Sequence, residues 1–275
     1  MTPTSTIDDV ELRLLLQAIY ETFSYDFRGY SIASVRRRLG QAMRALECTT
    51  LSALQERVLH EPTVFPRLLE YLTVQVSDLF RDPGYFRTFR ERIVPILHTY
   101  PSIKLWVAGC SAGEEVYSFA ILLREEGLLE RTTIYATDIS AEALRAAEAG
   151  IYPVERLQAF TANHRASGAP CSLSEYYTAQ YGSAVFDRTL RNKVVFSDHS
   201  LATDTVFAEV QVVSCRNVLI YFERSLQDRA VGLFSDSLGR RGFLGLGSKE
   251  TLRFSQHEPS FEPFAAEERW YRRRA

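Results

Sequence analysis

The sequence predicts an α/β fold, a doubly wound parallel sheet that follows an all-helical N-terminal segment. Residues 103–108 form an apolar run that stops at Gly109, and an amphipathic segment opens with two glutamates just after Gly113. A strand, a tight turn and a helix produce this pattern. Residues 133–138 form a second apolar strand, which places the beginning of a βαβ arrangement in the middle of the chain.

The N-terminal residues 8–76 are expected to be all-helical, because apolar residues recur there with a helical period. They are Val10, Leu14, Leu15, Ala18, Ile19, Leu51, Leu54, Val58, Phe65, Leu68, Leu69 and Leu72. Residues 31–44 carry no acid and four arginines: Arg36, Arg37, Arg38 and Arg44. A solvated face with one or two internal ion pairs is the ordinary interpretation. A docking face for an acidic helical partner is the alternative.

The composition is that of a soluble globular protein, with 275 residues, 46% hydrophobic residues and a formal net charge of −2. No signal peptide is expected, since residues 1–9 are short and polar, and no apolar run approaches the roughly 20 residues that cross a bilayer. Four cysteines without paired spacing indicate reduced thiols in a cytoplasm. The five scattered histidines predict no metal site, and the near-neutral charge argues against nucleic-acid binding.

Glycine at position 109 lets the backbone approach a ligand closely, because glycine has no Cβ. A dinucleotide fingerprint that began at Gly109 would need glycines where Ser111 and Glu114 stand. Glu114 and Glu115 would also repel a pyrophosphate. An electropositive ligand without phosphate, such as S-adenosylmethionine, therefore fits better. An ordinary βα turn without a ligand is the alternative.

Asp138 stands where the second strand ends, and an acid there can accept hydrogen bonds from both ribose hydroxyls of an adenosine. The alternative role is the N-cap of the helix expected at Ala141–Ala149. Ser140 can provide that cap, which favours the ribose role for Asp138.

Residues 152–192 interrupt this pattern, since they are rich in Tyr, Ser, Ala and Thr and show no long helical period. We expect a small β-containing insertion with a hairpin whose strands, 176–181 and 184–186, flank a Gly182-Ser183 turn. Further elements are expected at 194–196, 209–215, 224–238, 242–247, 261–264 and 269–273. A seven-stranded sheet with a reversed final hairpin is typical of Rossmann-like class I S-adenosylmethionine-dependent methyltransferases.

The stretch Cys215-Arg-Asn-Val-Leu-Ile-Tyr-Phe222 resembles a motif of the CheR-type chemotaxis receptor glutamate O-methyltransferases. The resemblance extends over nearly the whole chain and includes Leu79-Phe-Arg81, the segment from Ala108 to Glu115, and Gly247-Ser-Lys-Glu250. It implies a helical domain at 1–80 and a methyltransferase domain at 81–275, with the insertion at about 153–192. It also implies methyl transfer from S-adenosylmethionine to glutamates in the cytoplasmic coiled coil of a methyl-accepting chemoreceptor, with S-adenosylhomocysteine as product. A monomer without membrane insertion is expected.

The resemblance places the cofactor contacts beside Gly109 at Ser77, Arg81, Glu115, Asp138, Leu201, Asn217 and Val218. Two positions depart from the family pattern, because Gln75 and Ser200 stand where asparagines are usual. Each change could cost on the order of 1 kcal/mol of cofactor binding. We therefore expect weakened rather than abolished binding.

Methyl transfer to a glutamate needs no general base, since a carboxylate with a pKa of about 4.3 is already ionised at neutral pH. It needs the carboxylate held in line with the sulfonium methyl, which the forked guanidinium of Arg81 can do. Tyr221 could orient the acceptor or pack beside the methyl group. The alternatives are an Arg81 paired with Asp78 or Asp82, and a Tyr221 that is only part of the core.

Two other functions compete with an active methyltransferase. A cofactor-binding signalling module of the same fold, catalytically weak or inactive, is suggested by Gln75 and Ser200. A nicotinamide oxidoreductase is disfavoured by the missing glycines.

Overall fold

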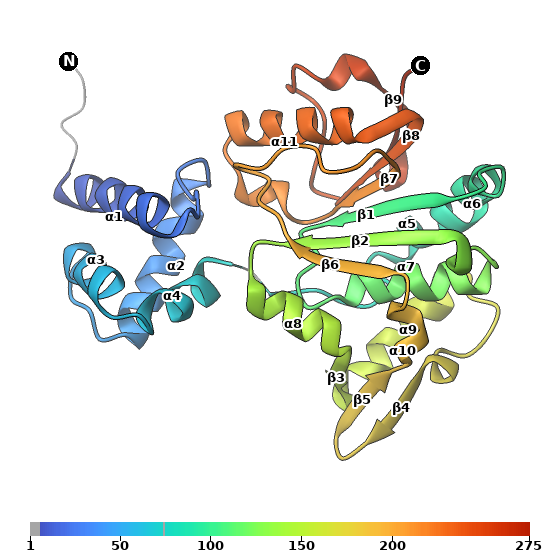
Figure 1. Ribbon diagram of the computed structural model, residues 1–275, viewed down its shortest axis with the longest axis horizontal. Helices are drawn as coiled ribbons and strands as arrows, with labels where there is room; N and C mark the ends of the chain where they lie inside the picture. The colour runs from blue at the N-terminus through green and yellow to red at the C-terminus, as the bar shows by residue number, and fades with distance from the viewer. Residues whose placement is uncertain (1–5, 74) are drawn as a thin grey trace. The chain divides into compact units, whose positions relative to one another are not determined.

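The computed structural model describes residues 6–73 and 75–275 (Figure 1). By its internal contacts the chain divides into two units. The helical unit contains the N-terminal helices together with Ser200–Asp204 and Tyr221–Ala230. The sheet unit contains Gln75–His199, Thr205–Ile220 and Val231–Ala275. Two parts of the chain lie outside the described residues. They are residues 1–5, within the polar N-terminal stretch where no signal peptide is expected, and Val74, near the end of the expected helical segment.

The helical unit is built from α1 Ile7–Phe23, α2 Ile32–Ala45, α3 Leu51–His60 and α4 Val64–Leu72. Helix α1 packs on α3, and α2 packs on α4. The buried stripe of α1 consists of Leu12, Leu15, Leu16 and Ile19, which are spaced as one helical face. Leu14, an expected core residue, is 51% exposed, so the core face of α1 is rotated from the expected one. The all-helical character of the segment is confirmed.

The arginines of α2 point in different directions, as three consecutive helical residues must. Arg36 forms an ion pair with Asp9, and Arg37 and Arg44 are exposed. Arg38 is buried, although the sequence gives no sign of it, and its Nη1 donates to Leu72 O. The structure therefore shows a mixed face with an internal ion pair rather than a continuous basic surface.

The sheet unit contains a seven-stranded sheet in the order β6-β2-β1-β7-β8-β10-β9 (Figure 1). The strands are β1 Ile103–Ala108, β2 Thr132–Asp138, β6 Val194–Asp198, β7 Val210–Cys215, β8 Leu238–Leu246, β9 Phe261–Ala265 and β10 Trp270–Arg273. Strands β6, β2, β1, β7 and β8 pair in parallel, and β10 runs antiparallel to β8 and β9. The expected parallel sheet with a reversed final hairpin is confirmed.

Helices α5 Pro83–Thr88 and α6 Val94–Leu97 precede β1. Helices α7 Glu114–Glu125, α8 Ala141–Ala149 and α11 Arg224–Ser237 follow β1, β2 and β7, respectively. A π-helical turn, Phe89–Ile93, joins α5 to α6. Of the helices that the structure describes, none combines the length and hydropathy that a bilayer crossing requires.

The strand order reverses between β1 and β7. The chain passes from β1 outward to β2 and β6, and then returns to β7 on the other side of β1. In doubly wound sheets, ligands bind outside the carboxyl ends of the strands at such a switch point. The loops that follow β1, β2 and β7 are therefore the ones to inspect.

The insertion contains a three-stranded sheet of β3 Ile151–Pro153, β5 Ser183–Phe186 and β4 Tyr177–Gln180. Its hairpin turn is Tyr181-Gly182, one residue before the expected turn. Both turn residues have positive φ, 51° and 77°, as a two-residue type I′ turn requires. The insertion also contains α9 Leu157–Ala166 and α10 Arg188–Arg191, which the sequence pattern did not predict.

Candidate functional site

The loop after β1 is fixed against its two neighbouring strands. Gly109 has φ 74°, and a Cβ there would lie 2.5 Å from Cγ2 of Val218 in the loop after β7, so only glycine fits. The Gly109 N–H donates to Thr137 O at 2.8 Å, which ties the loop to the end of β2. Ser111 Oγ donates to Gln75 Oε1 at 2.6 Å. Gln75, which stands where the family usually has asparagine, thus has a hydrogen-bond partner in this loop.

Asp138 closes the site at the end of β2. Its Oδ2 accepts from Ser111 N and its Oδ1 from Ser140 N, both at 2.9 Å. Ser140 caps α8, since its Oγ accepts from Ala143 N at 3.2 Å, so Asp138 is not needed as the cap. Burial raises the pKa of Asp138, while the backbone N–H donors act in the opposite direction. Each carboxylate oxygen keeps a lone pair that a ligand hydroxyl can use.

Glu115, the second residue of α7, belongs to a buried charge network. Its Oε1 accepts from Ser214 Oγ at 2.5 Å and its Oε2 from Arg216 Nη1 at 3.0 Å. Nη2 of Arg216 donates to Asp82 Oδ2 at 2.7 Å and to Arg81 O at 2.8 Å. Burial acts to lower the pKa of the Arg216 guanidinium, but the nearby carboxylates outweigh it and leave this pKa raised. Arg216 therefore joins the start of α7 to the backbone at Arg81.

Glu250 holds the loop after β7. Its Oε2 accepts from Asn217 N at 3.0 Å and from Gly247 N at 2.6 Å. Its Oε1 accepts from Val218 N at 2.9 Å and from Ile220 N at 3.3 Å. These four bonds hold Asn217 in a left-handed conformation with φ 60°. The two expected cofactor contacts in this loop are thus positioned by a carboxylate from another segment.

We expect Glu250→Gln to destabilise the protein by about 2 kcal/mol or more. The amide NH₂ would face two backbone N–H groups that lose their acceptor, and each buried unsatisfied donor costs about 1–3 kcal/mol. Urea unfolding measures the difference. Glu258→Gln, at an exposed position nearby, is the matched control and should change stability by less than about 0.5 kcal/mol. Equal effects of the two substitutions would contradict the anchoring role of Glu250.

Residues 75–82, here called the 75–82 loop, carry Arg81 in a strained backbone. Phe80 and Asp82 have φ values of 50° and 56°, so left-handed residues flank Arg81 on both sides. The Phe80 N–H donates to the buried Ser118 Oγ at 2.7 Å. Arg81 Nη1 donates only weakly, to Val76 O at 3.3 Å. Strained backbone of this kind is concentrated at functional sites.

The two acids beside Arg81 pair with other arginines. Asp78 Oδ1 accepts from Arg156 Nη2 at 2.9 Å, and Asp82 pairs with Arg216. Among the residues that the structure describes, no carboxylate forms an ion pair with Arg81. The structure thus contradicts the alternative in which Arg81 pairs with Asp78 or Asp82. Its guanidinium remains available for an acid from outside.

Three of the expected site residues lie in the helical unit. Ser200 N donates to Asp204 Oδ2 at 2.9 Å, and Ser200 Oγ accepts from Ala202 N at 3.3 Å. Leu201 is buried. Tyr221 lies with its ring 4.5 Å from the guanidinium carbon of Arg38. The remaining expected residues belong to the sheet unit: Gln75, Ser77, Arg81, Gly109, Glu115, Asp138, Asn217 and Val218.

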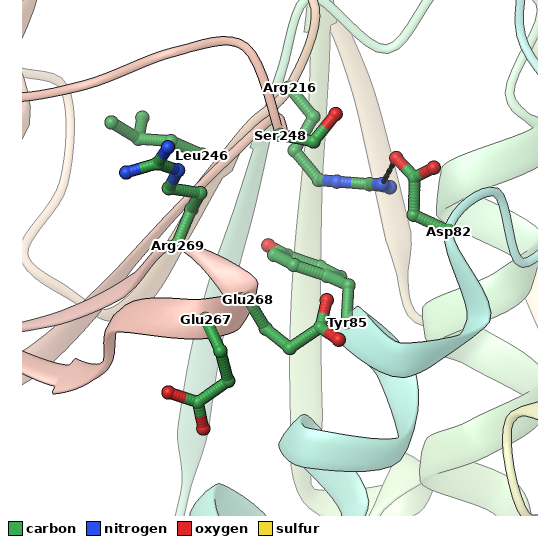
Figure 2. Close-up of a pocket in the computed structure, with 8 residues that line it drawn as sticks. All are labelled: Asp82, Tyr85, Arg216, Leu246, Ser248, Glu267, Glu268 and Arg269. Atoms are coloured by element: carbon green, nitrogen blue, oxygen red, sulfur yellow. Dashed lines mark hydrogen bonds and ion pairs between the residues drawn. The ribbon is translucent and has the colours of Figure 1, made fainter.

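A small cavity lies behind Asp82 and Arg216 (Figure 2). Figure 2 shows the Arg216 guanidinium directed at Asp82, with Glu268 reaching toward Tyr85 from the opposite side. The volume of about 20 Å³ admits about one water molecule. Burial, reinforced by Asp82 and Glu267, raises the pKa of Glu268. This cavity is too small for an adenosine.

The residues at the switch point suit S-adenosylmethionine. Gly109 packs against Val218 where a Cβ would not fit, which brings the loops after β1 and β7 together at the carboxyl ends of their strands. Asp138 provides acceptors for hydroxyl groups. Glu114 and Glu115, the acids expected to repel a phosphate, open α7 and are paired with Arg156 and Arg216.

Sequence reasoning missed three residues that build this site: Arg156, Arg216 and Glu250. Arg216 and Glu250 stand inside the two motifs that carry the family resemblance, and that was the available signal. Arg156 is in the insertion, where the sequence offers no comparable sign.

Two family models match the chain. One, described as CheR methyltransferase, SAM binding domain, matches residues 75–269. The other, described as CheR methyltransferase, all-alpha domain, matches residues 10–73. Together they cover both units of the structure.

Similar proteins carry related names. A Pseudomonas putida protein named "Putative methyltransferase Cher3" is 58% identical over 96% of this chain and 97% of its own length. Chemotaxis protein methyltransferase 2 of Pseudomonas aeruginosa is 28% identical over 85% of each chain. The chemotaxis protein methyltransferase of Listeria innocua is 25% identical over 82% of this chain and 84% of its own.

Proposed function

Because the chain belongs to the CheR methyltransferase family, we propose that it methylates glutamate side chains of a chemoreceptor-like protein. The chain is an S-adenosylmethionine-dependent methyltransferase of a family with named chemotaxis members. The proposed acceptors are glutamates in the cytoplasmic domain of a methyl-accepting receptor or a related signalling protein, so the reaction takes place in the cytoplasm. The observation that carries this proposal is the Arg81 guanidinium, which has no acid partner among the described residues.

Methyl transfer to a carboxylate requires the protein mainly to position the reacting groups. When bound, S-adenosylmethionine supplies an electrophilic methyl group on a positively charged sulfur and leaves as S-adenosylhomocysteine. An O–CH₃ bond forms as the S–CH₃ bond breaks, and no proton moves, because a glutamate is ionised at neutral pH. What remains for the protein is to align the carboxylate and keep water out.

Several of the expected site residues have a part in this scheme. Arg81 binds both oxygens of the acceptor carboxylate through its planar fork and so orients one of them for attack. Asp138 accepts from the ribose hydroxyls of the cofactor. Asn217 and Val218, held by Glu250, line the site on the β7 side. A role of Tyr221 in orienting the acceptor stays a prediction, and within the helical unit its ring lies against Arg38.

A cofactor-binding module without turnover is the competing function. It was suggested by the departures at Gln75 and Ser200. In the structure both side chains are hydrogen-bonded, Gln75 to Ser111 and Ser200 to Ala202. The departures are therefore accommodated by local contacts, which supports the enzyme over the module.

Labelled methyl transfer tests the proposal. The protein is incubated with methyl-labelled S-adenosylmethionine and a lysate that contains chemoreceptors, and the labelled bands are treated with mild alkali. We expect the label to leave as methanol, as it does from carboxyl esters. Label that resists alkali, or no incorporation above a boiled control, would refute glutamate methylation.

We expect Asp138→Ala to weaken the binding of S-adenosylhomocysteine by about 1.5–3 kcal/mol, because two ribose hydroxyls lose a charged acceptor. Calorimetry measures the dissociation constant. Asp198→Ala is the matched control, since Asp198 is exposed and pairs in register with Asp138 on β6. An unchanged constant for Asp138→Ala would remove this residue from the ribose site.

A further inference from the structure

The 75–82 loop receives its support from elsewhere in the chain. It contains no helix or strand, and Phe80 and Asp82 have left-handed backbone conformations. Such conformations are strained, and they persist only where surrounding contacts hold them. The atoms that hold it must therefore come from other elements. Arg216 and Ser118 supply two of these contacts.

Further contacts come from the insertion. Arg156 Nη2 donates to Ser77 O and, at 2.9 Å, to Asp78 Oδ1. Asn163 Nδ2 donates to Leu79 O at 3.1 Å. Four consecutive loop residues are held in this way, because the ring of Phe80 also packs on His164 with ring centroids 4.9 Å apart. One short segment of the insertion thus contacts the loop immediately before Arg81.

The supporting residues share one side of α9 and its N-cap residue, Arg156. Arg156, Phe160, Asn163 and His164 are spaced by four, seven and eight residues, which places them on one helical face. The Arg156 guanidinium lies 4.6 Å from the centre of the Phe160 ring, which fixes its direction.

Arg156 also reaches the cofactor side of the site. Its Nη1 donates to Glu114 Oε1 at 2.5 Å. Glu114 opens α7 directly after the glycine loop and is 2% exposed. A buried carboxylate depends strongly on its partner, and Arg156 is the base that pairs with Glu114 among the described residues. Tyr152 of β3 adds a bond from its hydroxyl to Ala112 O at 2.8 Å.

We propose that the insertion is part of the catalytic machinery, with Arg156 and Asn163 as positioning residues for the 75–82 loop. Arg156 holds the cofactor end of the loop at Ser77 and Asp78. Asn163 fixes Leu79, so that the backbone presents Arg81 to the acceptor. The second statement rests on the proposed role of Arg81, and the first does not.

Two substitutions with matched controls separate this role from a general structural one. Asn163→Leu removes the amide donor at similar size, and Gln158→Leu does the same at an exposed position of α9. Arg156→Lys keeps the charge but loses the fork, and Arg165→Lys is its exposed counterpart. Melting curves verify that each variant is folded.

The first readout needs neither cofactor nor acceptor. Amide hydrogen exchange of residues 76–82 in the cofactor-free protein should accelerate about tenfold in Asn163→Leu and in Arg156→Lys, and not in the controls. Either variant alone is sufficient for this measurement if the other does not fold. Unchanged exchange in a folded variant overturns the proposal.

The second readout distinguishes the two ends of the loop. Arg156→Lys should raise the dissociation constant of S-adenosylhomocysteine about fivefold, and Asn163→Leu should leave it nearly unchanged while kcat falls about fivefold. In an Arg81→Ala background, Asn163→Leu should lower kcat no further, because it acts through Arg81. A full fivefold loss in that background would overturn the role of Asn163. If receptor glutamates prove not to be the acceptor while exchange still accelerates, the proposed function fails and the support by the insertion stands.

Discussion

Arg81→Ala is expected to slow single-turnover methyl transfer by well over tenfold while the protein melts at the wild-type temperature. The Arg81 side chain has no acid partner among the described residues, so its removal leaves no buried carboxylate without a cationic partner. Arg81→Lys should lose about tenfold in kcat, a transition-state effect of roughly 1.4 kcal/mol, because lysine keeps the charge but not the two-pronged geometry. The affinity for S-adenosylhomocysteine should remain close to that of the wild type in Arg81→Lys.

The comparison for Arg81 is Arg145→Ala, at an exposed position of α8, which should leave both turnover and melting unchanged. A purely structural Arg81 predicts the opposite result: a lowered melting temperature and normal turnover per folded molecule. Wild-type turnover in folded Arg81→Ala would take this residue out of the active site.

Arg216→Met should destabilise the sheet unit by about 3–5 kcal/mol. The side chain is 1% exposed, and its removal leaves Glu115 and Asp82 without their cationic partner and the carbonyl of Arg81 without its donor. For a domain of this size the change corresponds to a melting temperature lowered by roughly 6–20 °C. Calorimetric or fluorescence melting measures it.

A second substitution distinguishes the cost of an unpaired Glu115 carboxylate from the cost of lost packing. Arg216→Met combined with Glu115→Gln neutralises the carboxylate that Arg216 leaves unpaired, so the double variant should be less destabilised than the sum of the two single ones. Arg240→Met, at an exposed position of β8, is the control for the substitution itself. A shift for Arg216→Met no larger than that of Arg240→Met would show that the buried network contributes little.

The parts of the fold that depend on neighbouring residues could be predicted from the sequence. The glycine loop is predictable because the apolar run of β1, the glycine at 109 and the acidic start of α7 are adjacent in the chain. The capping of α8 by Ser140 is local in the same sense, and it is confirmed. The parallel sheet and its reversed final pair follow from successive strand patterns.

The contacts that support the site could not be predicted in this way. Arg216 meets Glu115 across 101 residues, and Arg156 meets Asp78 across 78 residues. No periodicity relates such pairs, so their partners become visible only once the chain is folded. The sequence left open whether Asp78 or Asp82 would pair with Arg81. In the structure both acids form ion pairs with other arginines.

Local predictions failed where side-chain patterns were weak. The buried face of α9 has Leu157, Phe160 and the polar His164, so the apolar period was too short to indicate a helix. The hairpin turn was misplaced by one residue, because Tyr181 adopts a positive φ that is unusual for an aromatic residue. In α1 the exposed Leu14 obscured the stripe that packs on α3.

Identifying the methylated atom is the decisive measurement. A purified cytoplasmic fragment of a chemoreceptor is incubated with the protein and S-adenosylmethionine that carries a deuterated methyl group, and its peptides are sequenced by mass spectrometry. We predict deuterated methyl esters on specific glutamates, formed well over tenfold more slowly by Arg81→Ala and absent from a fragment in which those glutamates are replaced by alanine. Methyl groups on lysine or another side chain, or equal esterification by Arg81→Ala, would contradict an enzyme that uses this arginine to orient a glutamate.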